Sequence, residues 1–309
     1  MKNFIIKCIV FVILWVIPSF IADFAISHLV QPQSNLKSWQ DIYSGDIKAD
    51  LVVFGSSRTH YGFNPKIVED SLHIQAYNLG MTAGQIQIDY LRLLEYLRLN
   101  SYKPKYITLE IDFFTIEKIN TISKHWQLFP YMLYNKNVYK CTFGMNGYKK
   151  CYYFCPLVRY CGNFVDLFHN SRIAPPKDYY KGHCPRHDHF DNMWSPNNDT
   201  AKMAIKIDSK KIDFLIDFIN TCKDNNIKLN FIYSPEFYYV SHKVTNRDSI
   251  INILKNIAQQ NNIPYADMSQ PSFCSDTAYF YDMRHLNSRG ADKFTSEYYV
   301  PWIKSLYKL

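Results

Sequence analysis

The sequence predicts an α/β fold in which a parallel sheet carries helices on both faces. Short apolar runs without interruption, typical of strands buried on both faces, begin with Leu-Val-Val-Phe at 51–54. Such runs alternate along the chain with longer segments in which apolar residues recur at helical spacing, as at 85–99. This alternation predicts a parallel sheet that binds its ligand at the carboxyl ends of the strands.

The expected elements follow in order, with helices between the strands. Asn64 and Pro65 have the pattern of an N-cap followed by a first-turn proline. Pro301 is expected to kink the last helix. The expected strands are 51–54, 75–79, 106–111, 229–233 and 264–268, and the expected helices are 64–71, 85–99, 206–222, 248–260 and 288–307.

The alternation stops between about 113 and 200, which predicts an insertion in an α/β domain of 49–309. The chain has 309 residues, of which 47% are hydrophobic and 20% charged, enough apolar material for a full core. The net charge of +8 is concentrated in the insertion, because nine basic and three acidic residues lie between 136 and 190. Its many tyrosines either bind sugars or anionic headgroups, or pack on the sheet.

The first 30 residues form a candidate membrane anchor. Cys8–Ala22 has no charged residue and approaches the roughly 20 residues that span a bilayer. Lys2 and Lys7 precede this run and Asp23 follows it, which places the amino terminus in the cytoplasm. We therefore expect a single-pass protein of the cell membrane whose main domain is extracytoplasmic.

One alternative to a retained anchor stays open. The anchor could be a cleavable signal peptide, although Ala22–Ala25 lacks the small-x-small pattern of a cleavage site. A polar linker is expected at 31–48.

The chain has eight cysteines, and their central cluster either forms one or two disulfides or remains as buried free thiols. This cluster comprises Cys141, Cys151, Cys155 and Cys161.

Two distant motifs could form a catalytic site. Gly55-Ser56-Ser57 follows the first strand, where a tight turn can expose a serine hydroxyl and backbone N–H groups that stabilise an oxyanion. Asp282 and His285 lie on one loop before the final helix, so the carboxylate can orient the imidazole as a base for the serine. The alternative is a surface Asp–His pair.

Together with Asn78-Leu79-Gly80 after the second strand, these motifs resemble the SGNH (GDSL-like) hydrolase superfamily. The resemblance implies a three-layer, flavodoxin-like fold with Ser57 as the nucleophile, His285 as the base and Asp282 as its partner. It also implies an oxyanion hole formed by the N–H groups of Ser57 and Gly80. It implies no cofactor.

One motif of the superfamily is missing. An asparagine after the third strand usually donates to the oxyanion, but this chain has Leu109-Glu110-Ile111-Asp112-Phe113 there. Losing such a donor can cost roughly 3–4 kcal/mol of transition-state stabilisation. Arg58 could substitute for it or bind substrate with Asp112, and the alternative is a surface arginine paired with Asp112 or Glu110.

The Gly-Ser-Ser-Arg sequence, the missing asparagine and the single span resemble the membrane-anchored branch of the superfamily, whose members assist alginate acetylation or teichoic-acid D-alanylation. This resemblance implies an esterase or O-acyltransferase acting on acyl esters of cell-envelope polysaccharide, with an integral-membrane acyltransferase as a further partner. The alternative is a non-catalytic envelope protein that binds a glycan or a partner acyltransferase through a degenerate cleft.

Two other functions are expected to be absent. The segment 183–189 has four side chains that could bind zinc, but their spacing fits no established zinc finger and a catalytic zinc would have no obvious general base nearby, so we expect no metal. An extracytoplasmic domain makes nucleic acid an unexpected partner despite the basic insertion.

Overall fold

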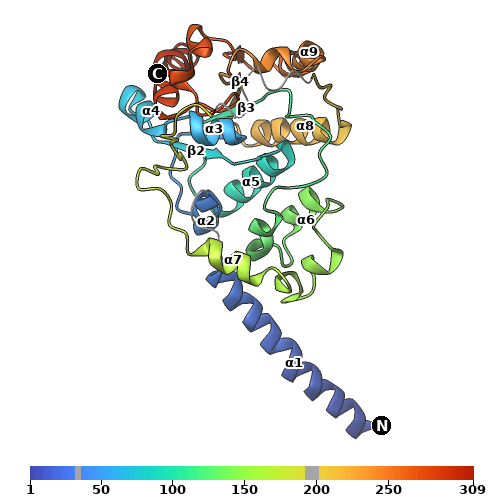
Figure 1. Ribbon diagram of the computed structural model, residues 1–309. Coiled ribbons are helices and arrows are strands. Elements are labelled where there is room, and N and C mark those ends of the chain that lie inside the picture. Colours follow the sequence, from blue (N-terminus) through green and yellow to red (C-terminus); the bar gives the residue numbers. More distant parts are fainter. Residues whose placement is uncertain (32–35, 192–201) are drawn as a thin grey trace. The chain divides into compact units, whose positions relative to one another are not determined.

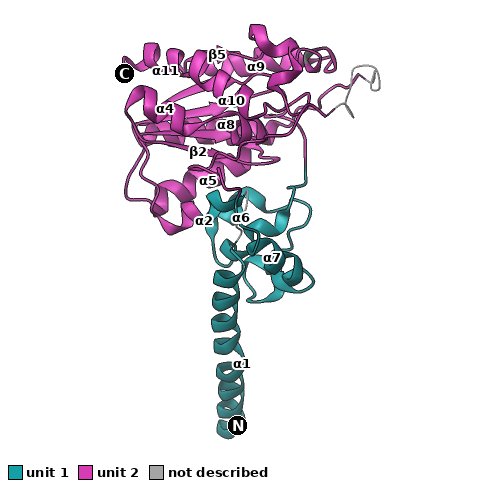
Figure 2. Ribbon diagram, turned by 60° about the vertical axis from the view of Figure 1, so that its left-hand side comes forward, with its two compact units in different colours: residues 1–40, 120–175 teal, residues 41–119, 176–309 magenta. Residues whose placement is uncertain are grey.

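The computed structural model describes residues 1–31, 36–191 and 202–309, which form two compact units. Unit 1 comprises Met1–Gln40 and Asn120–Pro175, and unit 2 comprises Asp41–Ile119 and Pro176–Leu309 (Figure 2). Parts of the expected linker and of the expected insertion, at 32–35 and 192–200, lie outside the described residues.

Unit 2 is built on a five-stranded parallel sheet, which confirms the predicted fold class. Across the sheet the order is β2-β1-β3-β4-β5. The direction of winding reverses between β1 and β3, and flavodoxin-like sheets of this order bind ligands at the carboxyl ends beside that reversal. The strands are β1 (Leu51–Gly55), β2 (Ala76–Gly80), β3 (Tyr106–Glu110), β4 (Lys228–Tyr233) and β5 (Tyr265–Asp267).

Helices cover both faces of this sheet (Figure 1). On one face α5 and α8 pack against each other, and on the other α4 contacts β2 and α11 (Figure 2). The helices of unit 2 are α3 (Ser57–Gly62), α4 (Pro65–Leu72), α5 (Ile86–Leu99), α8 (Ser209–Asp224), α9 (Arg247–Gln260), α10 (Ser288–Phe294) and α11 (Val300–Tyr307).

The predicted strands and all but the last predicted helix agree with the structure to within three residues. The expected helix 288–307 is instead divided into α10 and α11 by one π-helical turn at Thr295–Tyr299. Pro301 lies in the first turn of α11, where its missing N–H costs least. In place of the kink expected at Pro301, the helix therefore has a π-helical turn, which is wider than an α-helical turn and ends just before the proline.

Outside the expected insertion, two short helices lie where the sequence predicted none. Helix α2 (Lys37–Ser44) lies within the expected polar linker, but Trp39 and Ile42 are fully buried, so this segment is packed. Helix α3 begins directly after β1, and the Ser56 side chain caps it by accepting from the Arg58 N–H. Helices of two turns are too short to show a reliable period in sequence.

Unit 1 contains α1 (Lys2–Leu29), α6 (Lys136–Thr142) and α7 (Phe164–Ser171), joined by loops and 3₁₀ turns. Helix α1 is long and apolar enough to span a membrane. All eight cysteines of the chain are free thiols, so the disulfides considered for the central cluster are not formed. In that cluster, Cys141 is buried whereas Cys155 and Cys161 are exposed.

Candidate active site

The structure brings Ser57 and His285 together at the carboxyl edge of the sheet. Ser57 Oγ lies 2.7 Å from His285 Nε2. Ser57 is the first residue of α3, directly after β1, and His285 lies on the loop before α10. Helices α3 and α10 pack against each other, and Asn287 caps α10 through the Gly290 N–H. Packing of these two helix starts therefore sets the distance between the hydroxyl and the imidazole.

Asp282 lies on the other side of the imidazole. Its carboxylate oxygens are 2.8 and 2.9 Å from His285 Nδ1. Burial alone would raise the pKa of Asp282, but the hydrogen bond and charge interaction with His285 lower it below its usual value, together with backbone N–H groups of Arg284 and His285. An ionised Asp282 favours a proton on Nδ1, which leaves Nε2 able to accept the Ser57 proton.

The turn before Ser57 requires glycine at position 55. Gly55 has φ of +147°, and a Cβ there would lie 2.4 Å from Thr59 Oγ1 and 2.7 Å from Glu110 Cβ. The buried Asn78 of β2 holds α3 from the other side, because its Nδ2 donates to Thr59 O at 2.7 Å and Phe63 O at 2.8 Å. These contacts fix the start of α3 and thus the position of Ser57.

The structure does not support Gly80 as an oxyanion donor. Its backbone N–H already donates to Asn78 Oδ1 at 2.8 Å, and the residue is buried against α3. The N–H of Ser57 is positioned differently, since the first N–H groups of a helix have no acceptor within that helix. Gly84, which the motifs did not single out, lies beside this turn, because a Cβ there would be 3.3 Å from Ser56 Cα.

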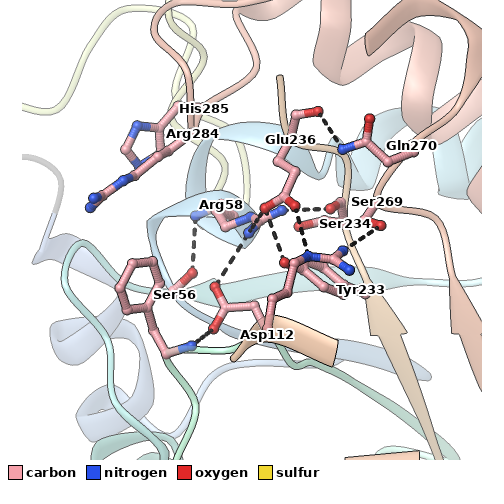
Figure 3. A network of polar contacts seen from close by, with 12 residues as sticks. Ser56, Arg58, Asp112, Tyr233, Ser234, Glu236, Ser269, Gln270, Arg284 and His285 are labelled. Atoms are coloured by element: carbon pink, nitrogen blue, oxygen red, sulfur yellow. Dashed lines mark hydrogen bonds and ion pairs between the residues drawn. The ribbon is translucent and has the colours of Figure 1, made fainter. Parts of the chain in front are cut away.

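Arg58 is buried among carboxylates, so it is neither a surface arginine nor open to substrate. Its guanidinium lies 3.2 Å from Glu236 and 3.4 Å from Asp112, and it donates to Ser234 O at 2.6 Å (Figure 3). Burial alone would lower the pKa of Arg58, but the charges of Glu236, Glu110 and Asp112 raise it. The pairing alternative describes Arg58 better than substrate binding does, and its partners are Glu236, Asp112 and Glu110.

Glu110 stands near the position of the missing asparagine and contacts the nucleophile turn. It accepts from Ser56 Oγ at 3.1 Å and from Ser234 Oγ at 2.9 Å. Burial and the charge of Asp112 raise the pKa of Glu110, against the effect of Arg58. Sequence reasoning missed Ser234 and Glu236, although polar residues directly after β4 were a usable signal.

The segment considered for zinc is divided between two environments. His183 is buried with Nε2 3.1 Å from Tyr61 O, whereas the largely exposed His187 contacts Asp178. Within the described residues, no group of three or more His, Cys, Asp or Glu side chains could hold a metal ion.

Two buried histidines make a pH-dependent contribution to stability. Burial lowers the pKa of His60 to about 3 and that of His183 to about 4, and each is kept neutral in the folded state. Below the ordinary histidine pKa of about 6.5, the unfolded chain binds protons that the folded chain does not. We expect the free energy of unfolding to fall by about 1.2 kcal/mol for each histidine between pH 6 and 5.

Denaturant unfolding at several pH values checks this prediction. His183→Asn should reduce the dependence on pH, whereas the exposed His73→Asn, at a left-handed helix end, should leave it unchanged. Equal slopes in wild type and His183→Asn would contradict it.

Comparisons with known proteins give only structural likenesses. No protein-family model and no curated protein matches the chain. Similar solved structures include a protein described as an acylhydrolase from Bacteroides fragilis, with 14% identity, a TM-score of 0.42 and coverage of 86% of this chain and 94% of that one. A GDSL-like lipase from Bacteroides thetaiotaomicron has 12% identity, a TM-score of 0.41 and coverage of 89% and 97%. An acetyl xylan esterase has 14% identity, a TM-score of 0.42 and coverage of 83% and 99%.

Proposed function

We propose that the chain is a serine-dependent esterase or O-acyltransferase that acts on acyl esters of cell-envelope polysaccharide. The observation that supports this proposal best is the continuous contact from Ser57 Oγ through His285 to Asp282. The side chains of His285 and Asp282 are about one fifth exposed, so a substrate can approach them from solvent.

In this mechanism, Ser57 Oγ attacks the carbonyl carbon of the ester while His285 Nε2 takes its proton. The Ser57 N–H stabilises the negative charge on the carbonyl oxygen of the tetrahedral intermediate. When the intermediate collapses, the C–O bond to the alcohol breaks and His285 returns the proton to that alcohol. Water or a glycan hydroxyl then attacks the acyl-enzyme with His285 again as the base, giving hydrolysis or transfer respectively.

The substrate class comes from the sequence motifs. The Gly-Ser-Ser-Arg turn and the amino-terminal span resemble the membrane-anchored branch described above, and α1 supports attachment to a membrane. We place the chain in the cell membrane with its α/β domain extracytoplasmic, beside an acylated envelope glycan and an integral-membrane acyltransferase.

A non-catalytic binding protein is the second candidate. It is favoured by the hydrogen bond that occupies the Gly80 N–H and by the lack of an amide side chain after β3, since both remove oxyanion donors. Ser57, His285 and Asp282 would then form a polar cleft that binds a glycan or partner enzyme without chemistry.

A fluorophosphonate probe, which reacts with activated serines, tests the proposal. We expect covalent labelling of the full-length protein and its loss in Ser57→Ala, while the exposed Ser272→Ala remains labelled. Absence of labelling in the wild type, or equal labelling of Ser57→Ala, would overturn the proposed esterase or O-acyltransferase activity. The non-catalytic binding protein would then be the remaining candidate.

A further inference from the structure

Unit 1 exposes apolar side chains beside α1. Tyr134, Phe143, Phe154 and Val158, which we call the apolar patch, are 61%, 53%, 43% and 38% exposed. The surrounding segment 120–175 has seven basic residues and one acidic residue. Exposed apolar side chains gathered with positive charge are typical of surfaces that bind a partner or a membrane.

The length of α1 indicates where a membrane would end. At about 1.5 Å per residue, Lys2–Ala22 measures roughly 30 Å, the thickness of the hydrocarbon core of a bilayer. Side chains as far as Ile17 are exposed along the helix, whereas Asp23 is 2% exposed. Asp23 therefore lies at the edge of the hydrocarbon region.

Asp23 ties the end of α1 into unit 1. Both of its carboxylate oxygens accept from the buried Arg159 guanidinium, at 2.6 and 2.7 Å, and one also accepts from the Leu157 N–H at 2.6 Å. Cleavage beyond Asp23 would remove its carboxylate and leave Arg159 buried without an anionic partner, which is strongly unfavourable. These contacts favour a retained anchor over a cleaved signal peptide, and they fix the rest of unit 1 against α1.

The apolar patch begins at this level of α1. The ring of Phe20 stacks on Tyr134 with centroids 6.1 Å apart, and Tyr134 contacts Phe154 at 6.2 Å. Val158 follows Leu157, whose N–H bonds to Asp23. Helix α7 also lies beside the end of α1 in both views (Figures 1 and 2). The patch is thus placed at the boundary between the hydrocarbon core and the lipid headgroups.

We propose that the apolar patch docks on the surface of the bilayer that α1 spans, with Lys149 and Lys150 facing anionic headgroups. Both lysines are exposed and lie between Phe143 and Phe154 in sequence. Aromatic side chains are favoured at the membrane interface, and lysines near it attract anionic lipid. This surface is independent of the proposed esterase activity.

The full-length chain in nanodiscs of phosphatidylcholine and phosphatidylglycerol tests the docking. With Cys8, Cys151 and Cys161 replaced by serine, a fluorophore can be attached to the exposed Cys155 beside Phe154, while the other four cysteines are buried. We expect stronger quenching by lipid with a nitroxide at the headgroup than by lipid with one deep in its acyl chain. A fluorophore on Cys8 instead should show the reverse preference, because Cys8 lies within the span.

Quenching at Cys8 without quenching at Cys155 would overturn the proposal. The apolar patch would then be a surface that binds a protein partner. The charge is tested separately by Lys149→Glu with Lys150→Glu, which should reduce quenching at Cys155 when phosphatidylglycerol is present. The matched reversal of two exposed lysines, Lys210→Glu with Lys304→Glu, should not. Equal losses in the two double variants would overturn the role of the anionic headgroups.

Discussion

Asp282→Asn is expected to lower kcat/KM for an activated acyl ester by about 10⁴-fold in a chain that still folds. The carboxylate lies 2.8 Å from His285 Nδ1 and keeps the proton on that nitrogen. An asparagine amide can instead donate to Nδ1, which moves the ring proton to Nε2. His285 then cannot accept the Ser57 proton. Hydrolysis of a nitrophenyl ester and the rate of fluorophosphonate labelling both measure this loss.

A matched control separates the tautomer from the loss of a charge. Asp276 is exposed and accepts from the Ala278 N–H, a role that asparagine also fills, so Asp276→Asn should retain activity. Wild-type rates in a folded Asp282→Asn variant would remove Asp282 from the mechanism. Slow labelling of Asp282→Asn, with unchanged binding of a non-reactive ester, would be consistent with the role of Asp282 in the mechanism.

The fold was predictable because its signals are local. The run Leu51–Phe54 is buried at every position, and Asn64 caps the helix that it was expected to begin. Helix α2 was not predictable in this way, since its buried Trp39 faces Gln127 and Tyr131, far away in sequence. Such packing depends on partners that a local pattern does not contain.

For the candidate site, the meeting of the two motifs was predictable, whereas the hydrogen bonds of single backbone groups were not. Parallel strands end at one edge of the sheet, so the motifs at Ser57 and His285 could be expected to meet there. Which acceptor each backbone N–H finds could not be predicted from the sequence. Gly80 is an example, because its N–H donates to the side chain of Asn78, two residues earlier. Arg58 was also misjudged in part, because its acceptors after β4 become neighbours only through the strand order.

The second large effect is expected from Arg58→Met, which should reduce the free energy of unfolding by about 3–5 kcal/mol at neutral pH. The side chains of Arg58, Glu110, Asp112 and Glu236 are each at most 6% exposed. Without the guanidinium, Glu110 and Asp112 would lose the ion pair that the described part of the chain gives them, and Glu236 would retain Arg247 at 3.4 Å. Denaturant unfolding of wild type and variant measures the difference.

Two comparisons identify charge as the cause. Arg284 is exposed and lies over the Phe114 ring, so Arg284→Met should change stability little. Adding Glu236→Gln to Arg58→Met should recover part of the loss, because it removes one of the unpaired negative charges. No recovery would indicate that lost packing is the cause.

The pH dependence of this variant has a defined sign. Carboxyls that lose their cation in the fold take a pKa above that of the unfolded chain, so their ionisation opposes folding as the pH rises. The stability difference between wild type and Arg58→Met should therefore be larger at pH 8 than at pH 5. If Arg58 instead bound substrate, the variant would raise KM and unfold like the wild type at both pH values. The buried contacts with Glu236 and Asp112 favour the first result.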